Sequence, residues 1–179
     1  DYQDLLRMSV ASAGNDHRLG AQEAPPAIVS MFLGNELTAI LDSIEAGTMY
    51  DPCTQEVMKV GVHILPRFPK DTTDRNRTSP FAFTGNKFEF RMLGSDLSIA
   101  GPNIILNTIV AEGLSQFADE LEAADDLSAA LPALIRRTIR QHKRIIFNGN
   151  NYALEWTAEA ARRGLYNLPT TVEALKPFV

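Results

Sequence analysis

Cysteine and long apolar runs are the two features that this sequence most clearly lacks. Cys53 is the single cysteine among 179 residues, so a disulfide framework within the chain is excluded and a reducing compartment is indicated. No apolar run approaches the roughly 20 residues that span a membrane, and the first residues show no signal-peptide pattern. We therefore expect a cytoplasmic protein without a membrane partner.

Histidine and the common catalytic motifs are also scarce. His17, His63 and His142 lie far apart and form no His-x-x-x-His pair, so a self-contained zinc site is not expected. The sequence has no Gly-x-Ser-x-Gly elbow and no glycine-rich phosphate loop followed by lysine. These gaps leave charged side chains as the chemistry that the chain can offer.

Excess positive charge is missing as well. The net charge is −5, which argues against a protein built to coat nucleic acid. A basic cluster does occur at Arg136, Arg137, Arg140, Lys143 and Arg144. Since an acidic helical segment precedes it, we interpret this cluster as a solvated helix face with an acidic partner and expect no nucleic-acid partner.

The pattern of the chain predicts an α+β fold with antiparallel strands followed by a helical C-terminal region. Residues 27–33 and 86–92 have the composition and alternation of strands, with a weaker strand at 60–65. A helix is predicted from an Asn35 cap to Gly47. We divide the chain at residues 1–97 and 98–179, as two parts of one domain.

Beyond residue 98 the pattern is helical. Two apolar stripes at helical spacing predict buried helix faces, and they comprise Leu106, Val110, Leu114, Phe117 and Leu121, then Leu131, Ile135, Ile139 and Ile146. A further helix is predicted at 151–163, and a capping-box pattern at 170–173 begins a short last one.

The segment 86–92 is the most informative of the predicted strands. Alternation places Lys87, Glu89 and Arg91 on one face and sends Phe88, Phe90 and Met92 to a buried face. A carboxylate between two cations suits a site that handles phosphate together with a metal ion. A salt-bridged edge strand with a purely structural role explains the same pattern.

Two other blocks precede this strand. Arg18 is followed five residues later by Glu-Ala-Pro at 23–25, and Asn-Arg-Thr-Ser stands at 76–79. In their order and spacing these blocks, with Lys-Phe-Glu-Phe-Arg at 87–91, resemble the second half of the catalytic domain of glutamine synthetase. The sequence around these blocks, over residues 11–110, is similar to that of the large type III branch of the family.

The resemblance implies an activity and a set of roles. The family joins ammonium to L-glutamate at the expense of ATP, through γ-glutamyl phosphate. By this resemblance Glu89 binds one of the divalent ions, Mg²⁺ or Mn²⁺, that bridge the ATP phosphates. Arg91 contacts glutamate and the transferring phosphoryl group, while Arg77 and Lys87 contact the nucleotide.

The resemblance also implies roles for the first block. Arg18 holds a carboxylate of glutamate, and Glu23 lies on a flap that closes the site and takes the proton from the attacking ammonium. The sequence departs from the familiar bacterial type at Ala82, where a second arginine is found in that type. The stretch between the Glu-Ala-Pro block and the Asn-Arg block is also much longer than in that type, with a helix and loop inserted over about residues 34–70.

The remaining family blocks are missing from this chain. The chain starts without methionine inside an amphipathic segment, and we expect it to be a piece of a longer protein, carrying half a site and inactive alone. The family resemblance implies a large homo-oligomer for the whole protein. Two alternatives stay open: a noncatalytic helical interaction module, and a related γ-glutamyl-amine ligase.

Overall fold

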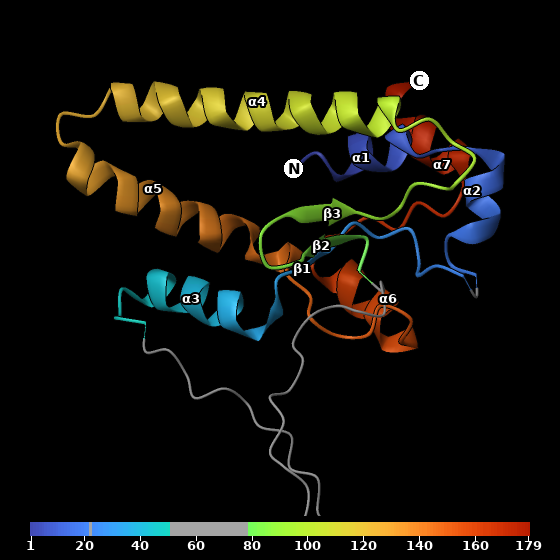
Figure 1. Ribbon diagram of the computed structural model, residues 1–179, viewed down its shortest axis with the longest axis horizontal. Coiled ribbons are helices and arrows are strands. Elements are labelled where there is room, and N and C mark those ends of the chain that lie inside the picture. Colours follow the sequence, from blue (N-terminus) through green and yellow to red (C-terminus); the bar gives the residue numbers. More distant parts are fainter. Residues whose placement is uncertain (22, 51–78) are drawn as a thin grey trace, which may run out of the picture.

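The computed structural model describes residues 1–21, 23–50 and 79–179, and within them it is a mixture of helices and a small sheet (Figure 1). No described helix is long and apolar enough to cross a membrane. The elements in chain order are α1 (Gln3–Ser9), α2 (Ala13–Arg18), β1 (Met31–Phe32), α3 (Gly34–Ala46), β2 (Phe81–Phe83), β3 (Phe88–Phe90), α4 (Ala100–Glu122), α5 (Leu127–His142), the 3₁₀-helix η1 (Lys143–Ile145), α6 (Leu154–Arg162), α7 (Thr171–Leu175) and the 3₁₀-helix η2 (Lys176–Phe178).

The sheet has three strands in the order β1-β2-β3. β2 and β3 pair antiparallel, with Ala82 opposite Glu89, whereas β1 pairs parallel to β2. The expected arrangement of antiparallel strands is therefore wrong for β1. The α+β class itself is what the structure shows.

The predicted strand at 27–33 is mostly irregular, and only Met31–Phe32 forms a strand of the sheet. Its neighbours explain this: Ile28 bridges Asn167 and Met31 bridges Ile146, both far along the chain. The segment thus divides its pairing between β2 and C-terminal loops. The predicted strand at 60–65 lies outside the described residues.

The apolar face of β3 is only partly buried. Met92, just after the strand, is 2% exposed, and Phe90 is half-buried, but Phe88 is 47% exposed. The prediction that all three lie under the C-terminal helices is therefore wrong for Phe88. The Phe88 ring stacks on Phe81 at a centroid distance of 5.5 Å. The long C-terminal helices make their main contacts elsewhere, α4 with α1 and α5 with α3.

Helix α3 ends as predicted but begins differently. Gly47 follows its last turn with a left-handed φ of 72°, a conformation that glycine adopts without strain. Asn35 is inside the helix rather than at its cap. The side chain of Asn148, more than a hundred residues away, accepts hydrogen bonds from the backbone N–H groups of Leu33 and Gly34, both at 3.0 Å.

Helices α4 and α5 form a long open hairpin that projects away from the sheet (Figure 1). Asp126 caps α5 by accepting from the N–H groups of Ser128 and Ala129, and an ion pair joins Glu120 to Arg137 across the two helices. The predicted acidic–basic pairing is therefore confirmed for this pair. The predicted burial of the apolar stripes is wrong in large part, since Val110 and Leu114 are 56% and 62% exposed.

The last part of the chain packs back against the segment leading to the sheet. The rings of Trp156 and Phe147 stack at a centroid distance of 3.7 Å, and Trp156 joins Ile28, Ala160 and Leu165 in a buried cluster. The predicted capping box at Thr170 is confirmed, since its side chain and that of Glu173 bond reciprocally to the backbone.

Candidate active site

A cleft of about 490 Å³ opens between the end of α2, the loop that follows it and β3. Four of the predicted site residues, Arg18, Glu23, Glu89 and Arg91, line this cleft. Its size is in the range of small-molecule sites. Its other lining residues are Leu19, Ala24, Pro25, Pro26, Ser79, Pro80 and Met92.

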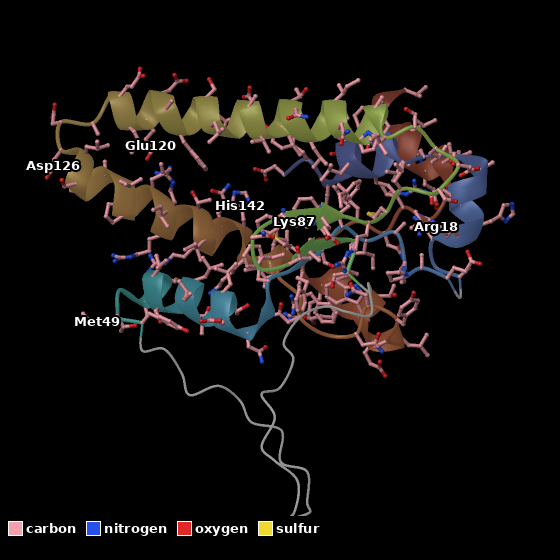
Figure 2. All side chains as sticks on the ribbon, in the orientation of Figure 1. Arg18, Met49, Lys87, Glu120, Asp126 and His142 are labelled. Atoms are coloured by element: carbon pink, nitrogen blue, oxygen red, sulfur yellow. The ribbon has the colours of Figure 1, made fainter. Side chains whose placement is uncertain are left out.

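Arg18 enters the cleft from the last turn of α2. Ser12 caps this helix by accepting a hydrogen bond from the Asn15 N–H. The half-buried guanidinium of Arg18 donates to the Asn15 side chain and to the Met92 carbonyl. Figure 2 shows Arg18 at this end of α2. Protein acceptors therefore hold its guanidinium in place.

Glu23 lies exposed on the loop that closes one side of the cleft. Gly20 begins the loop with a φ of 82°, and its N–H donates to the carbonyls of Ala24 and Pro25 at 3.2 and 2.9 Å. Leu19 and Ala24, on either side, are buried beneath the loop. The loop is thus anchored at its base while the Glu23 carboxylate stands open to solvent.

Glu89 lies in β3, Arg91 follows the end of this strand, and the two side chains contact each other. Arg91 donates from Nε and Nη2 to Glu89 Oε2 at 3.2 and 3.1 Å. These hydrogen bonds lower the pKa of Glu89 below its ordinary 4.5, outweighing the effect of burial, and the charges of Arg91 and Lys87 add to the shift. Glu89 is therefore an ionised carboxylate at neutral pH, with its side chain 39% exposed.

Lys87 is placed differently from the other predicted site residues. Its side chain is 65% exposed, its Nζ lies 3.5 Å from Glu89 Oε1, and it does not line the cleft. Figure 2 labels it beside the β2–β3 hairpin. Lys87 therefore contacts a residue of the cleft, Glu89, without lining the cleft itself.

Arg77 lies outside the described residues. Ser79, two residues further in sequence, is buried in the cleft wall, where its Oγ accepts a hydrogen bond from Asn151 Nδ2 at 3.2 Å. Asn151 Oδ1 in turn accepts from Ser30 Oγ at 3.1 Å. No local sequence signal points to this buried chain of polar groups, because its bonded members are 72 and 121 residues apart.

Ala82 is fully buried directly across the ladder from Glu89. This position, which carries a second arginine in the familiar bacterial type, supplies no cation to the cleft here.

The described residues fit part of a divalent-ion site. The ionised Glu89 carboxylate is a hard oxygen donor of the kind that Mg²⁺ and Mn²⁺ accept. Among the residues that the structure describes there is no group of three or more histidine, cysteine, aspartate or glutamate side chains suited to a metal. Mg²⁺ takes six ligands in octahedral geometry, so Glu89 would be one contributor among several.

Guanidinium and carboxylate groups from three separate segments of the chain thus line one cleft. The family model described as glutamine synthetase C-terminal domain matches residues 130–179. Over 177 residues, the chain is 50% identical to the Type-3 glutamine synthetase of Dictyostelium discoideum, a match covering 97% of this chain and 24% of that protein.

Two bacterial relatives give the same result. The chain is 47% identical to the glutamine synthetase of Bacteroides fragilis over 98% of this chain and 25% of the relative. It is 46% identical to that of Butyrivibrio fibrisolvens over 100% of this chain and 26% of the relative. The chain belongs to the glutamine synthetase family, and it spans about a quarter of the length of these relatives.

Proposed function

We propose that this chain supplies the glutamate- and phosphate-binding half of a glutamine synthetase active site in a longer protein. The reaction joins ammonium to L-glutamate with ATP as the second substrate and γ-glutamyl phosphate as the intermediate. The observation that carries the proposal is the convergence of Arg18, Glu23, Glu89 and Arg91 on one cleft. Those residues come from three separate segments, and a structural salt bridge on an edge strand requires no such convergence.

Arg18 and Arg91 are the groups proposed to hold anionic parts of the substrates. A guanidinium binds a carboxylate or phosphate through paired N–H donors, which fixes both distance and orientation. Arg91 has a side chain only 15% exposed, so its charge acts in a partly desolvated place where electrostatic stabilisation is strong. Arg91 would thus stabilise the charge that spreads over the phosphoryl group during its transfer.

Glu89 is proposed as one ligand of a Mg²⁺ or Mn²⁺ ion, with Lys87 and Arg77 on the nucleotide side. When bound, such an ion neutralises charge on the ATP phosphates. Lys87 and Arg91 flank Glu89, so they keep its carboxylate deprotonated and oriented for that role.

Glu23 is proposed as the general base. Its loop lines the cleft, and the proposal places the approach of ammonium to a γ-glutamyl phosphate held by the arginines on this side. A carboxylate there can accept the proton that ammonium loses, and a closed loop excludes water that would hydrolyse the acyl phosphate.

The whole protein is proposed to complete the site with its remaining segments and with neighbouring copies in a homo-oligomer, so the chain alone should be inactive. A γ-glutamyl-amine ligase shares the phosphate-binding residues and would differ in the amine pocket. The noncatalytic interaction module has less support, because a module of that kind would not require the predicted site residues to line one cleft.

ADP release by the full-length protein tests the proposal. With glutamate and ATP, release should depend on added ammonium, and glutamine should form in equal amount. Release that depends on a larger amine, with ammonium inert, would identify the related ligase. No ADP release under any of these conditions contradicts the enzyme proposal, and the isolated 179-residue chain provides the control expected to be inactive.

A further inference from the structure

Asn15 is a buried polar residue behind the cleft that the proposed reaction does not use directly. Its side chain, 1% exposed, lies in α2 one turn before Arg18. Asn15 Nδ2 donates to the carbonyls of Val10 and Met92 at 2.8 and 2.9 Å. Because both bonds need amide protons, the nitrogen end faces these carbonyls and the oxygen end must face the other way.

The oxygen end of Asn15 faces Arg18. Asn15 Oδ1 accepts a hydrogen bond from Arg18 Nε at 2.9 Å, while Arg18 Nη2 donates to the Met92 carbonyl. The edge of the guanidinium formed by Nε and Nη2 is thus occupied by protein acceptors. Arg18 Nη1 makes no hydrogen bond within the described part of the chain, which leaves the outer edge, Nη1 and Nη2, to receive a carboxylate.

The same contacts tie Arg18 to the segment just after β3, which contains Arg91 and Met92. Met92, whose carbonyl accepts from both Asn15 and Arg18, directly follows Arg91 in the chain. Gly94, two residues after Met92, lies next to the Asn15 side chain, since a Cβ there would be 3.4 Å from Asn15 Oδ1. Asn15 therefore fixes the position of α2, and of Arg18, relative to the segment that contains Arg91.

We propose that Asn15 is a positioning residue for glutamate binding, which orients the Arg18 guanidinium so that its outer edge faces the cleft. This inference rests on the proposed function, since it depends on Arg18 binding a substrate carboxylate. An arginine side chain has four rotatable bonds. An acceptor at Nε disfavours most of the orientations in which the guanidinium would point away from the cleft.

Steady-state kinetics of the full-length protein test this role. Asn15→Ala should raise the KM for glutamate about 10-fold or more, with the KM for ATP nearly unchanged. Asn15→Ser, which keeps a buried hydroxyl too short to reach Arg18, should do the same if the alanine variant folds poorly. Asp16→Asn is the matched control, because it weakens the packing of the same helix through Arg7 and should leave the glutamate KM unaltered.

A double-mutant cycle separates this inference from the proposed function. Arg18→Lys removes the Nε donor, so adding Asn15→Ala to it should change the glutamate KM little further. If Arg18→Lys leaves the glutamate KM unchanged, or the protein makes no glutamine, the proposed role of Arg18 fails and the inference with it. If Arg18→Lys raises the KM but Asn15→Ala and Asn15→Ser do not, or if the effects in the cycle simply add, the positioning role is wrong and the proposed function stands.

Discussion

Glu89 and Glu23 are two carboxylates of one cleft in very different surroundings. Glu89 is held on β3 by hydrogen bonds from Arg91 and by the charge of Lys87. Glu23 is exposed on a loop and makes no ion pair within the described residues. The contrast suits a fixed ligand in one case and a proton acceptor that must meet an incoming substrate in the other.

The two carboxylates should therefore respond differently to metal in the full-length protein. Glu89→Ala should lower the affinity for divalent ions, with activity at least ~10–100-fold lower and partly restored by high Mg²⁺ or Mn²⁺. Glu23→Ala should leave ATP and metal binding nearly intact and lose roughly 10²–10⁴-fold in glutamine formation, because a general base is gone. Metal titrations of both variants provide the measurement. An equal response of the two to added metal would show that the roles are assigned wrongly.

The contribution of Glu159 to stability should depend on pH. Hydrogen bonds from Arg162 and Arg163 lower the pKa of Glu159 to about 2. A carboxylate with a depressed pKa contributes stability above its unfolded value near 4.5 and loses it as the pH falls toward 2. The Tm difference between the wild type and Glu159→Gln should thus be largest above pH 5 and shrink between pH 5 and 2. A difference that grows on acidification contradicts this assignment.

At the scale of one element, α3 shows how a distant residue can start a helix. Asn148 supplies the acceptor for the N–H groups of Leu33 and Gly34 and donates through Nδ2 to Thr38. A side chain from the loop after η1 thereby replaces the local cap.

Asn148→Ala should destabilise α3 by about 0.5–2 kcal/mol, the usual range for a lost cap. Hydrogen exchange of amides at the start of α3 in the full-length protein measures this directly. Asn148→Asp should retain protection, since it keeps the acceptor and adds negative charge at a helix N-terminus. Asn35→Ala is the matched control and should change protection little. A larger loss of protection in Asn35→Ala than in Asn148→Ala would show that Asn35 caps the helix, as the sequence predicted.

At the scale of the whole molecule, Arg7 joins the two ends of the chain. Its side chain is 1% exposed, pairs with Asp16 at 3.0 Å, and donates to the carbonyls of Leu168 and Pro169. Burial alone would raise the pKa of Asp16, but hydrogen bonds from Thr171 and Arg7 outweigh it and lower the pKa overall. The first two helices and the start of α7 are therefore held as one unit behind the cleft.

Arg7→Ala should destabilise this unit by about 3 kcal/mol or more, because Asp16 and two carbonyls lose a buried donor. Arg137→Ala removes an arginine from an exposed pair with Glu120, with side chains 56% and 42% exposed, and should destabilise the protein far less than Arg7→Ala, because solvent screens an exposed pair. Urea denaturation of the two full-length variants compares them. Equal losses in the free energy of unfolding would show that burial does not determine how much each pair stabilises the protein.

The sequence by itself determined those features whose signals lie within a few residues of one another. Gly47 ends α3 and Thr170 caps α7 because a left-handed glycine and a capping box are local devices. The alternation of Lys87, Glu89 and Arg91 placed Glu89 and Arg91 together, and the spacing of the motif blocks predicted the family. The roles of the site residues are still predictions, and Arg77 lies outside the described residues.

Only the tertiary structure decided the features that join distant segments. The parallel pairing of β1, the cap from Asn148 and the buried contact of Asn15 with Met92 link residues far apart in the chain. The exposure of Phe88 and of Val110 and Leu114 belongs here too, because an apolar stripe shows that a face can be buried but not what covers it. Helical periodicity is a property of one segment, whereas burial depends on which segments meet.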